Sequence, residues 1–176
     1  GFVCCRLRKR VSRSQSLRRT LRNEPSWPPN VVCSSVAICT HDLDRWELVV
    51  GSVESALTQS PPPEQLIVVV DHNPDLLARV VARWPDVEAV ANTGPRGLSA
   101  ARNTAMARAR NTVVAFLDDD AAAAPGWLSA LRAAFADPTV VGAGGPVVPD
   151  WAGRRPAWFP PEFDWVVGCT YVGMPT

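Results

Sequence analysis

The sequence predicts an α/β fold with a mainly parallel central sheet that is covered by helices. Short apolar runs alternate along the chain with segments whose apolar residues recur every three or four positions. The runs are apolar throughout rather than at alternate positions, which is typical of parallel strands buried on both faces. The 176 residues suffice for one domain, and 47% hydrophobic against 20% charged residues can supply its core.

Five apolar runs are predicted as strands. The second contains five consecutive β-forming residues and stops at Asp71, and the fourth is the most hydrophobic and stops at three aspartates. The third run is the weakest of the five. In chain order, the predicted strands cover residues 31–40, 66–70, 87–91, 112–117 and 139–143.

Four helices are predicted between these strands. Leu43, Trp46 and Val49 begin an apolar stripe in the first, which three prolines end. The second helix stops before a proline, the third is rich in alanine, and Pro125 suits the first turn of the fourth. The predicted helices cover residues 43–57, 76–84, 98–110 and 125–135.

Polar side chains follow three of the predicted strands. Right-handed crossovers bring the carboxyl ends of parallel strands to one edge of the sheet, where ligands bind. We therefore expect a ligand site at this edge. Its candidate residues are Thr40, His41 and Asp42 after the first strand, Asp71 after the second, and Asp118, Asp119 and Asp120 after the fourth.

The charge distribution divides the chain into three parts. Residues 1–30 hold eight of the 18 basic residues and one of the 17 acidic ones, so we expect a basic, disordered tail there. Residues 31–145 form the predicted domain. Residues 146–176 are rich in aromatic residues and proline; we expect the start of a truncated acceptor-binding region, with simple packing as the alternative. The net charge of residues 31–176 is −6, which argues against nucleic acid as a partner.

Several common classes of protein are excluded by absent patterns. No apolar run approaches the 18 residues of a membrane span, and no signal peptide is visible. We therefore expect a cytoplasmic protein, with peripheral membrane contact through the basic tail as an option. Five cysteines without CxxC spacing indicate reduced thiols. Serine-hydrolase, dinucleotide-binding and P-loop motifs are also missing.

The three adjacent aspartates are the strongest chemical signal. Their mutual repulsion is costly unless a cation or hydrogen bonds offset it. In an extended chain Asp118 and Asp120 point to one side, where they could hold Mg²⁺ or Mn²⁺. The alternative is a solvated loop that caps the next helix. The position at the ligand edge favours the metal.

Two other groups of candidate binding residues can each be interpreted in more than one way. Asp71 could accept hydrogen bonds from a ribose or a base, or could simply belong to an Asp-His-Asn-Pro turn. Arg102 and Asn103 lie near the start of the third helix, where an arginine could hold a phosphate or a carboxylate. Taken alone, a surface ion pair is the simpler interpretation of Arg102.

The segments 36–42, 68–71, 97–103 and 114–120 together resemble the successive signatures of family-2 glycosyltransferases. The resemblance covers residues 31–145, with a weaker echo over 151–173. It implies a GT-A-like fold, a Rossmann-like βαβ sandwich, and an inverting transfer of sugar from a nucleotide-diphosphate sugar to a hydroxyl of a carbohydrate, lipid or other acceptor. A role in making polysaccharides or glycoconjugates would follow.

The resemblance also implies roles for individual residues. Asp118 and Asp120 would be the outer acids of a DxD motif that holds Mg²⁺ or Mn²⁺ on the donor diphosphate. The residues implied in nucleotide-sugar binding are Thr40, His41, Asp42, Asp71, Arg102, Asn103, Asp118 and Asp119. No catalytic base matches the family pattern, so we expect the base beyond Thr176.

Two further functions remain open on the sequence alone. A catalytically incomplete domain could bind nucleotide sugars or a protein partner, as the missing base would allow. A sugar nucleotidyltransferase would share the fold class, but it would need a glycine-rich loop after the first strand, and residues 40–42 offer none.

Overall fold

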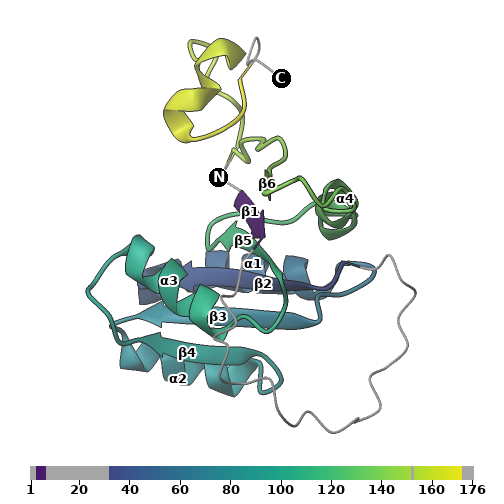
Figure 1. The fold of residues 1–176 in the computed structure, drawn as a ribbon. Helices are drawn as coiled ribbons and strands as arrows, with labels where there is room; N and C mark the ends of the chain where they lie inside the picture. Colours follow the sequence, from purple (N-terminus) through teal and green to yellow (C-terminus); the bar gives the residue numbers. More distant parts are fainter. Residues whose placement is uncertain (1–2, 7–31, 152, 172–176) are drawn as a thin grey trace, which may run out of the picture.

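The computed structural model describes residues 3–6, 32–151 and 153–171. Its centre is a six-stranded sheet with the strand order β4-β3-β2-β5-β1-β6 (Figure 1). The predicted α/β class is therefore confirmed. The strands are β1 Val3–Arg6, β2 Ser34–Thr40, β3 Gln65–Asp71, β4 Glu88–Asn92, β5 Val113–Asp118 and β6 Gly142–Ala143. The helices are α1 Trp46–Leu57, α2 Pro74–Arg83, α3 Leu98–Arg108 and α4 Trp127–Ala134, with 3₁₀ helices at Leu43–Arg45 (η2) and Pro161–Val167 (η3).

The strands β4, β3, β2 and β5 are all parallel to one another. Strand β2 pairs with β3 on one side and with β5 on the other, so that Cys39 lies opposite both Val69 and Asp118. Strand β3 then pairs with β4, with Asp71 opposite Asn92. These registers bring the carboxyl ends of four strands to one edge of the sheet, as the sequence predicts.

Each face of the parallel sheet is covered by a different set of helices. Alternate strand residues point to opposite faces, so Val36 and Ile38 pack on the side of α1 and α2, while Ala37 packs on the side of α3 (Figure 1). The stripe of Ala101 and Ala105 on α3 is buried against the sheet. Both faces of the parallel sheet are buried under helices, which explains why its strands are apolar at every position rather than at alternate ones.

The structure shifts several predicted boundaries. The first predicted helix begins as η2, because the Asp42 side chain caps Asp44 before α1 starts at Trp46. The predicted fifth strand shrinks to β6, which pairs antiparallel with β1 rather than joining the parallel set. A continuous apolar run over residues 139–143 therefore marks an edge here.

The expected tail over residues 1–30 differs from the structure at Val3–Arg6. These residues form β1, which pairs antiparallel with β5 and separates it from β6. Their apolar and β-forming composition suits a strand, but too few residues are involved for a periodicity to show. Residues 7–30 lie outside the described residues. Among the helices that the structure describes, none is long and apolar enough to cross a membrane.

Beyond β6 the chain folds back on itself. The backbone N–H of Thr170 donates to the carbonyl of Val147 at 2.8 Å, and the Thr170 hydroxyl accepts from Val147 N–H at 2.8 Å. Arg155 makes a two-pronged ion pair with the buried Asp164 at 2.6 and 2.8 Å. The aromatic ring of Trp151 packs edge-on against Phe159. Internal packing thus accounts for part of the aromatic content of residues 146–171.

A partly buried ion pair, with Arg132 as its buried member, ties α4 to the amino-terminal edge of the sheet. Arg132 is 8% exposed; it donates to Glu64 Oε2 at 2.5 Å, to Ser34 Oγ at 3.1 Å and to the carbonyl of Pro62 at 3.2 Å. Glu64 also accepts from the backbone N–H of Ser34 at 2.8 Å. Removing one partner of such a pair leaves the other charge buried without compensation.

We expect Glu64→Ala to lower the free energy of unfolding by about 2 kcal/mol, because it strands the Arg132 guanidinium. Urea unfolding followed by circular dichroism measures the change. Arg108→Ala is the matched control, since the Arg108 side chain is 58% exposed and lies 3.9 Å from Glu88. It should cost less than about 0.5 kcal/mol. Equal losses in the two variants would contradict a structural role for the Arg132–Glu64 pair.

Candidate functional site

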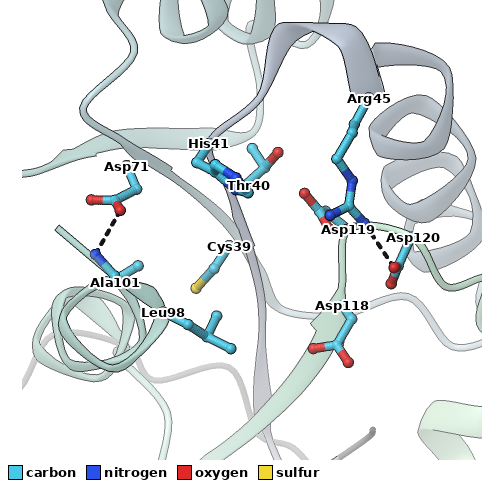
Figure 2. A pocket seen from close by; sticks show the side chains of 11 residues that line it. Cys39, Thr40, His41, Arg45, Asp71, Leu98, Ala101, Asp118, Asp119 and Asp120 are labelled. Carbon is cyan, nitrogen blue, oxygen red and sulfur yellow. Dashed lines mark hydrogen bonds and ion pairs between the residues drawn. The ribbon is translucent and has the colours of Figure 1, made fainter. Parts of the chain in front are cut away.

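A cavity of about 340 Å³ opens at the carboxyl edge of the parallel strands (Figure 2). Its walls come from the ends of β2, β3 and β5 and from the start of α3. Three separate strand ends thus contribute polar side chains to one space. Its polar lining residues include Thr40, His41, Arg45, Asp71, Asp118, Asp119 and Asp120.

Asp71 is held rigidly at the end of β3. Its Oδ1 accepts a hydrogen bond from Asn92 Nδ2 at 2.6 Å, and its Oδ2 accepts one from the backbone N–H of Gly97 at 2.8 Å. His72 Nδ1 lies 2.7 Å from the same Oδ1. Gly97 has a φ of +127°, which only glycine adopts without strain. The turn before α3 is therefore shaped to present its N–H to this carboxylate.

These contacts determine the charge state of Asp71. Burial by itself would raise the pKa of the carboxyl group. The hydrogen bonds from Asn92, His72 and Gly97 outweigh burial and lower the pKa to about 2. Asp71 is thus an ionised hydrogen-bond acceptor that lines the cavity. Its hydrogen bonds with Asn92 and Gly97 also tie the end of β3 to the end of β4 and to the turn before α3.

Two arginines separate the three adjacent aspartates. Strand β5 ends at Asp118, which pairs with Arg102 Nη2 at 3.1 Å. Asp119 and Asp120 lie in the turn that follows, and both contact Arg45 Nη2, at 3.0 and 2.7 Å (Figure 2). Strand geometry ends at Asp118, and the expectation that Asp118 and Asp120 share one side stays a prediction. Of the three aspartates, these two also line the second cavity described below.

The turn that carries the aspartates is anchored to α1. Ser52 donates to the carbonyl of Asp118 at 3.0 Å, and Ser55 accepts from the backbone N–H of Ala123 at 2.9 Å. The buried Gln59 donates to the carbonyl of Ala124 at 3.1 Å and accepts from the N–H of Leu128 at 3.1 Å. Two serines of α1 and Gln59, which follows the helix, thus satisfy the backbone of this segment and fix its path.

The carboxylates of Asp119 and Asp120 fit a hard divalent cation. They offer oxygen donors, which Mg²⁺ and Mn²⁺ prefer, and one cationic nitrogen already lies between them. The Oδ2 atom of Asp119 is buried and makes no hydrogen bond. In the part of the chain that the structure describes, no three His, Cys, Asp or Glu side chains form a metal-binding group. Mg²⁺ is commonly held by one or two carboxylates together with substrate phosphates.

The other predicted residues are placed differently from one another. Thr40 lines the cavity with its hydroxyl buried and without a hydrogen-bond partner, and His41 lines it at the exposed rim. Asp42 instead caps η2, and Asn103 is exposed on α3; neither lines this cavity. Burial raises the pKa of the Cys39 thiol to about 12, so this lining residue stays protonated.

A second cavity, of about 760 Å³, adjoins the first. The two cavities share Asp118 and Asp120. The second is bounded by α1, by the segment after Asp120 and by residues 146–151 and 167–169, and its apolar wall includes Leu48, Trp127 and Val147. The acidic turn is therefore accessible from two sides.

Sequence reasoning missed two residues that organise the site. Asn92 is buried, holds Asp71, and accepts from Gly94 N–H and Thr104 Oγ1, both at 3.0 Å. Its position at the end of the weakest predicted strand was the available signal. Arg45 was signalled by its place at the start of a helix, where a positive charge is unfavourable without a partner.

The fold and the cavity define an α/β domain with an acidic ligand site at the carboxyl edge of its sheet. Comparison with known families gives the particular class. Residues 35–167 match glycosyl transferase family 2. The chain belongs to that family, and the resemblance stated from the sequence is confirmed.

Two relatives describe the range of proteins to which the chain is similar. It is 40% identical over 144 residues to a protein of Haloferax volcanii named glucosyl-dolichyl phosphate glucuronosyltransferase; the match covers 80% of this chain and 46% of the relative. It is 44% identical over 55 residues to the pre-mycofactocin glycosyltransferase of Mycobacterium tuberculosis, which covers 31% of this chain and 12% of the relative. The chain thus spans less than half the length of these relatives.

We expect Asp71 to make stability depend on acid pH. Its pKa is lower in the folded chain than its ordinary value of 3.8. The stabilisation, about 2 kcal/mol, is therefore complete above about pH 5 and is lost as the pH falls through 3.8 toward 2. Urea unfolding between pH 5 and pH 2 measures it. Asp71→Asn should flatten this part of the profile.

Asp86→Asn provides the matched control. Asp86 is exposed and precedes β4, at the opposite edge of the sheet. The dependence of its free energy of unfolding on pH should match that of the original chain. A profile for Asp71→Asn as steep as that of the original chain would show that the hydrogen-bonded carboxylate does not contribute in this way.

Proposed function

We propose that the chain binds a nucleotide-sugar donor in the 340 Å³ cavity and serves a glycosyltransferase that passes the sugar to an acceptor hydroxyl with inversion. The observation that carries the proposal is the meeting of Asp71, Asp118 and Asp120 from two strand ends in one cavity, in a chain of glycosyl transferase family 2. Membership of the family supports the reaction class. The arrangement of the carboxylates supports the nature of the donor.

Different residues of the cavity suit the nucleoside and the diphosphate of such a donor. Asp71 is ionised and hydrogen-bonded from behind, so it suits a neutral donor group such as a ribose hydroxyl or a base N–H. Thr40 adds a buried hydroxyl whose hydrogen-bonding capacity is unused within the protein. A nucleoside placed here lies beside the carboxyl end of β2 and points its diphosphate toward the acidic turn.

The acidic turn suits the diphosphate only with a cation, because carboxylates and phosphates repel each other. Asp120, together with Asp118 or Asp119, would hold Mg²⁺ or Mn²⁺ there. A bound ion would neutralise the charge that develops on the departing nucleoside diphosphate. Arg102 keeps Asp118 in position through the 3.1 Å ion pair, so the carboxylate nearest the strand does not drift as the substrate enters.

The second cavity suits the acceptor. It reaches the same Asp118 and Asp120 from the other side, and Leu48, Trp127 and Val147 give it an apolar wall. The name of the Haloferax relative describes an acceptor that joins a sugar to a dolichyl lipid. We propose an acceptor of that general kind for this chain: a hydroxyl-bearing sugar linked to an apolar group.

Calorimetry on the whole chain tests the donor site. We expect a uridine or guanosine diphosphate to bind in the presence of Mn²⁺, and to bind about tenfold more weakly to Asp120→Asn, because a charge-assisted contact is lost. The matched control is Asp86→Asn, whose affinity should equal that of the original chain. The proposal fails if no nucleoside diphosphate binds with Mn²⁺ present, or if Asp120→Asn binds as tightly as the original.

A further inference from the structure

Arg45 makes an unusual contact in the site. A single nitrogen, Nη2, lies 3.0 Å from Asp119 Oδ1 and 2.7 Å from Asp120 Oδ2 (Figure 2). The Asp119 side chain is 9% exposed, so this contact is partly shielded from water. One positive group thus bridges two neighbouring carboxylates at a point inside the cavity.

Arg45 lies at the junction of η2 and α1. Arg45 is the N-cap residue of α1, and its side chain makes no capping hydrogen bond. The amino end of a helix carries partial positive charge, which repels a guanidinium. Arg45 is also the last residue of η2, and its side chain is paired with Asp119 and Asp120.

We propose that Arg45 is an internal counter-ion that occupies the cation position between Asp119 and Asp120 until a divalent ion displaces it. The displaced guanidinium then binds the diphosphate of the donor. This inference rests on the proposed function, which it deepens by assigning a residue to the exchange between the empty and the loaded site.

The exchange follows from space and charge. A divalent ion binds carboxylate oxygens at close to 2 Å, so it cannot share this point with a nitrogen that is within hydrogen-bond distance of both oxygens. Two positive groups at such separation also repel strongly in a partly shielded site. Binding of the ion and the present position of Arg45 therefore exclude each other.

The released side chain has a suitable target. Arg45 lines the donor cavity and is 32% exposed, so its guanidinium has room to turn. A planar guanidinium binds phosphate oxygens through two parallel hydrogen bonds. The positive charge that neutralises the aspartates in the empty site would neutralise phosphate in the loaded one. Arg45 is thus a positioning residue for the empty site and a binding residue for the donor.

The test measures Mn²⁺ and nucleotide binding separately on the whole chain. Arg45→Gln removes the competing charge, so Mn²⁺ alone should bind about tenfold more tightly than to the original chain. The affinity for uridine or guanosine diphosphate at saturating Mn²⁺ should fall by about tenfold, because the guanidinium is lost as a ligand. Calorimetry measures both, with the paramagnetic resonance of free Mn²⁺ as an independent measure of the first.

Two variants serve as controls. Arg45→Lys keeps a positive charge, so its Mn²⁺ affinity should stay near that of the original chain, while its nucleotide affinity falls because the fork of donors is gone. Arg83→Gln removes an exposed arginine whose partner is Glu54, away from the cavity, and should change neither affinity. Thermal unfolding identifies any variant that fails to fold. If Arg45→Gln does not fold, Arg45→Lys still tests whether the positive charge alone sets the Mn²⁺ affinity and whether the guanidinium group is needed for the nucleotide.

The outcomes separate this inference from the proposed function. If the original chain binds no nucleoside diphosphate with Mn²⁺, the proposed function fails. If the original chain binds it but Arg45→Gln binds Mn²⁺ alone no more tightly, Arg45 is not a competing counter-ion and the inference is overturned. Opposite changes in the two affinities on one substitution support it, since a general loss of structure would weaken both.

Discussion

The parallel pairing of β2 with β3 and β5 is the constraint on which the rest of the molecule depends. Because Ile38 lies opposite both Val68 and Leu117, the three strands stay in step up to their carboxyl ends. Both faces of this unit are buried, so a slip of one residue would exchange the residues of the two cores. The register that the apolar strand residues fix therefore places Asp71 and Asp118 at the same edge of the sheet. The relative positions of these two carboxylates thus depend on the packing of the core.

Charge at this edge is balanced by the protein itself. The three consecutive aspartates would destabilise the turn if they faced one another alone. Two arginines form ion pairs with them: Arg102 pairs with the aspartate that ends β5, and Arg45 pairs with the two in the turn. Meanwhile two serines of α1, together with Gln59 just after the helix, satisfy the backbone of the same segment. A segment rich in like charge is thus kept in one conformation by contacts within the protein.

The sequence was sufficient to predict the fold and the edge on which the site lies, because hydrophobic periodicity reports burial directly. It also predicted Asp71 and the aspartate run, which follow strongly apolar strands and line one cavity in the structure. It could not place Asn92, whose role depends on lying opposite Asp71 across a strand pair formed by residues far apart in the chain. Nor could it show that the chain turns after Asp118, since strand ends depend on hydrogen bonds to neighbours. The short β6 pairs with β1, which itself pairs with β5, and neither short strand leaves a periodic pattern in the sequence.

The two cavities meet at Asp118 and Asp120, so a molecule lodged in one of them forms part of the wall of the other. If the proposed donor and acceptor fill the two cavities, both molecules contact the same acidic turn, and the binding of one would affect the binding of the other. On that proposal, the first molecule to bind would help to enclose the second, and water would lose access to the space between them. The order of arrival and the suppression of wasteful hydrolysis would then both depend on the thin acidic turn that divides the two compartments.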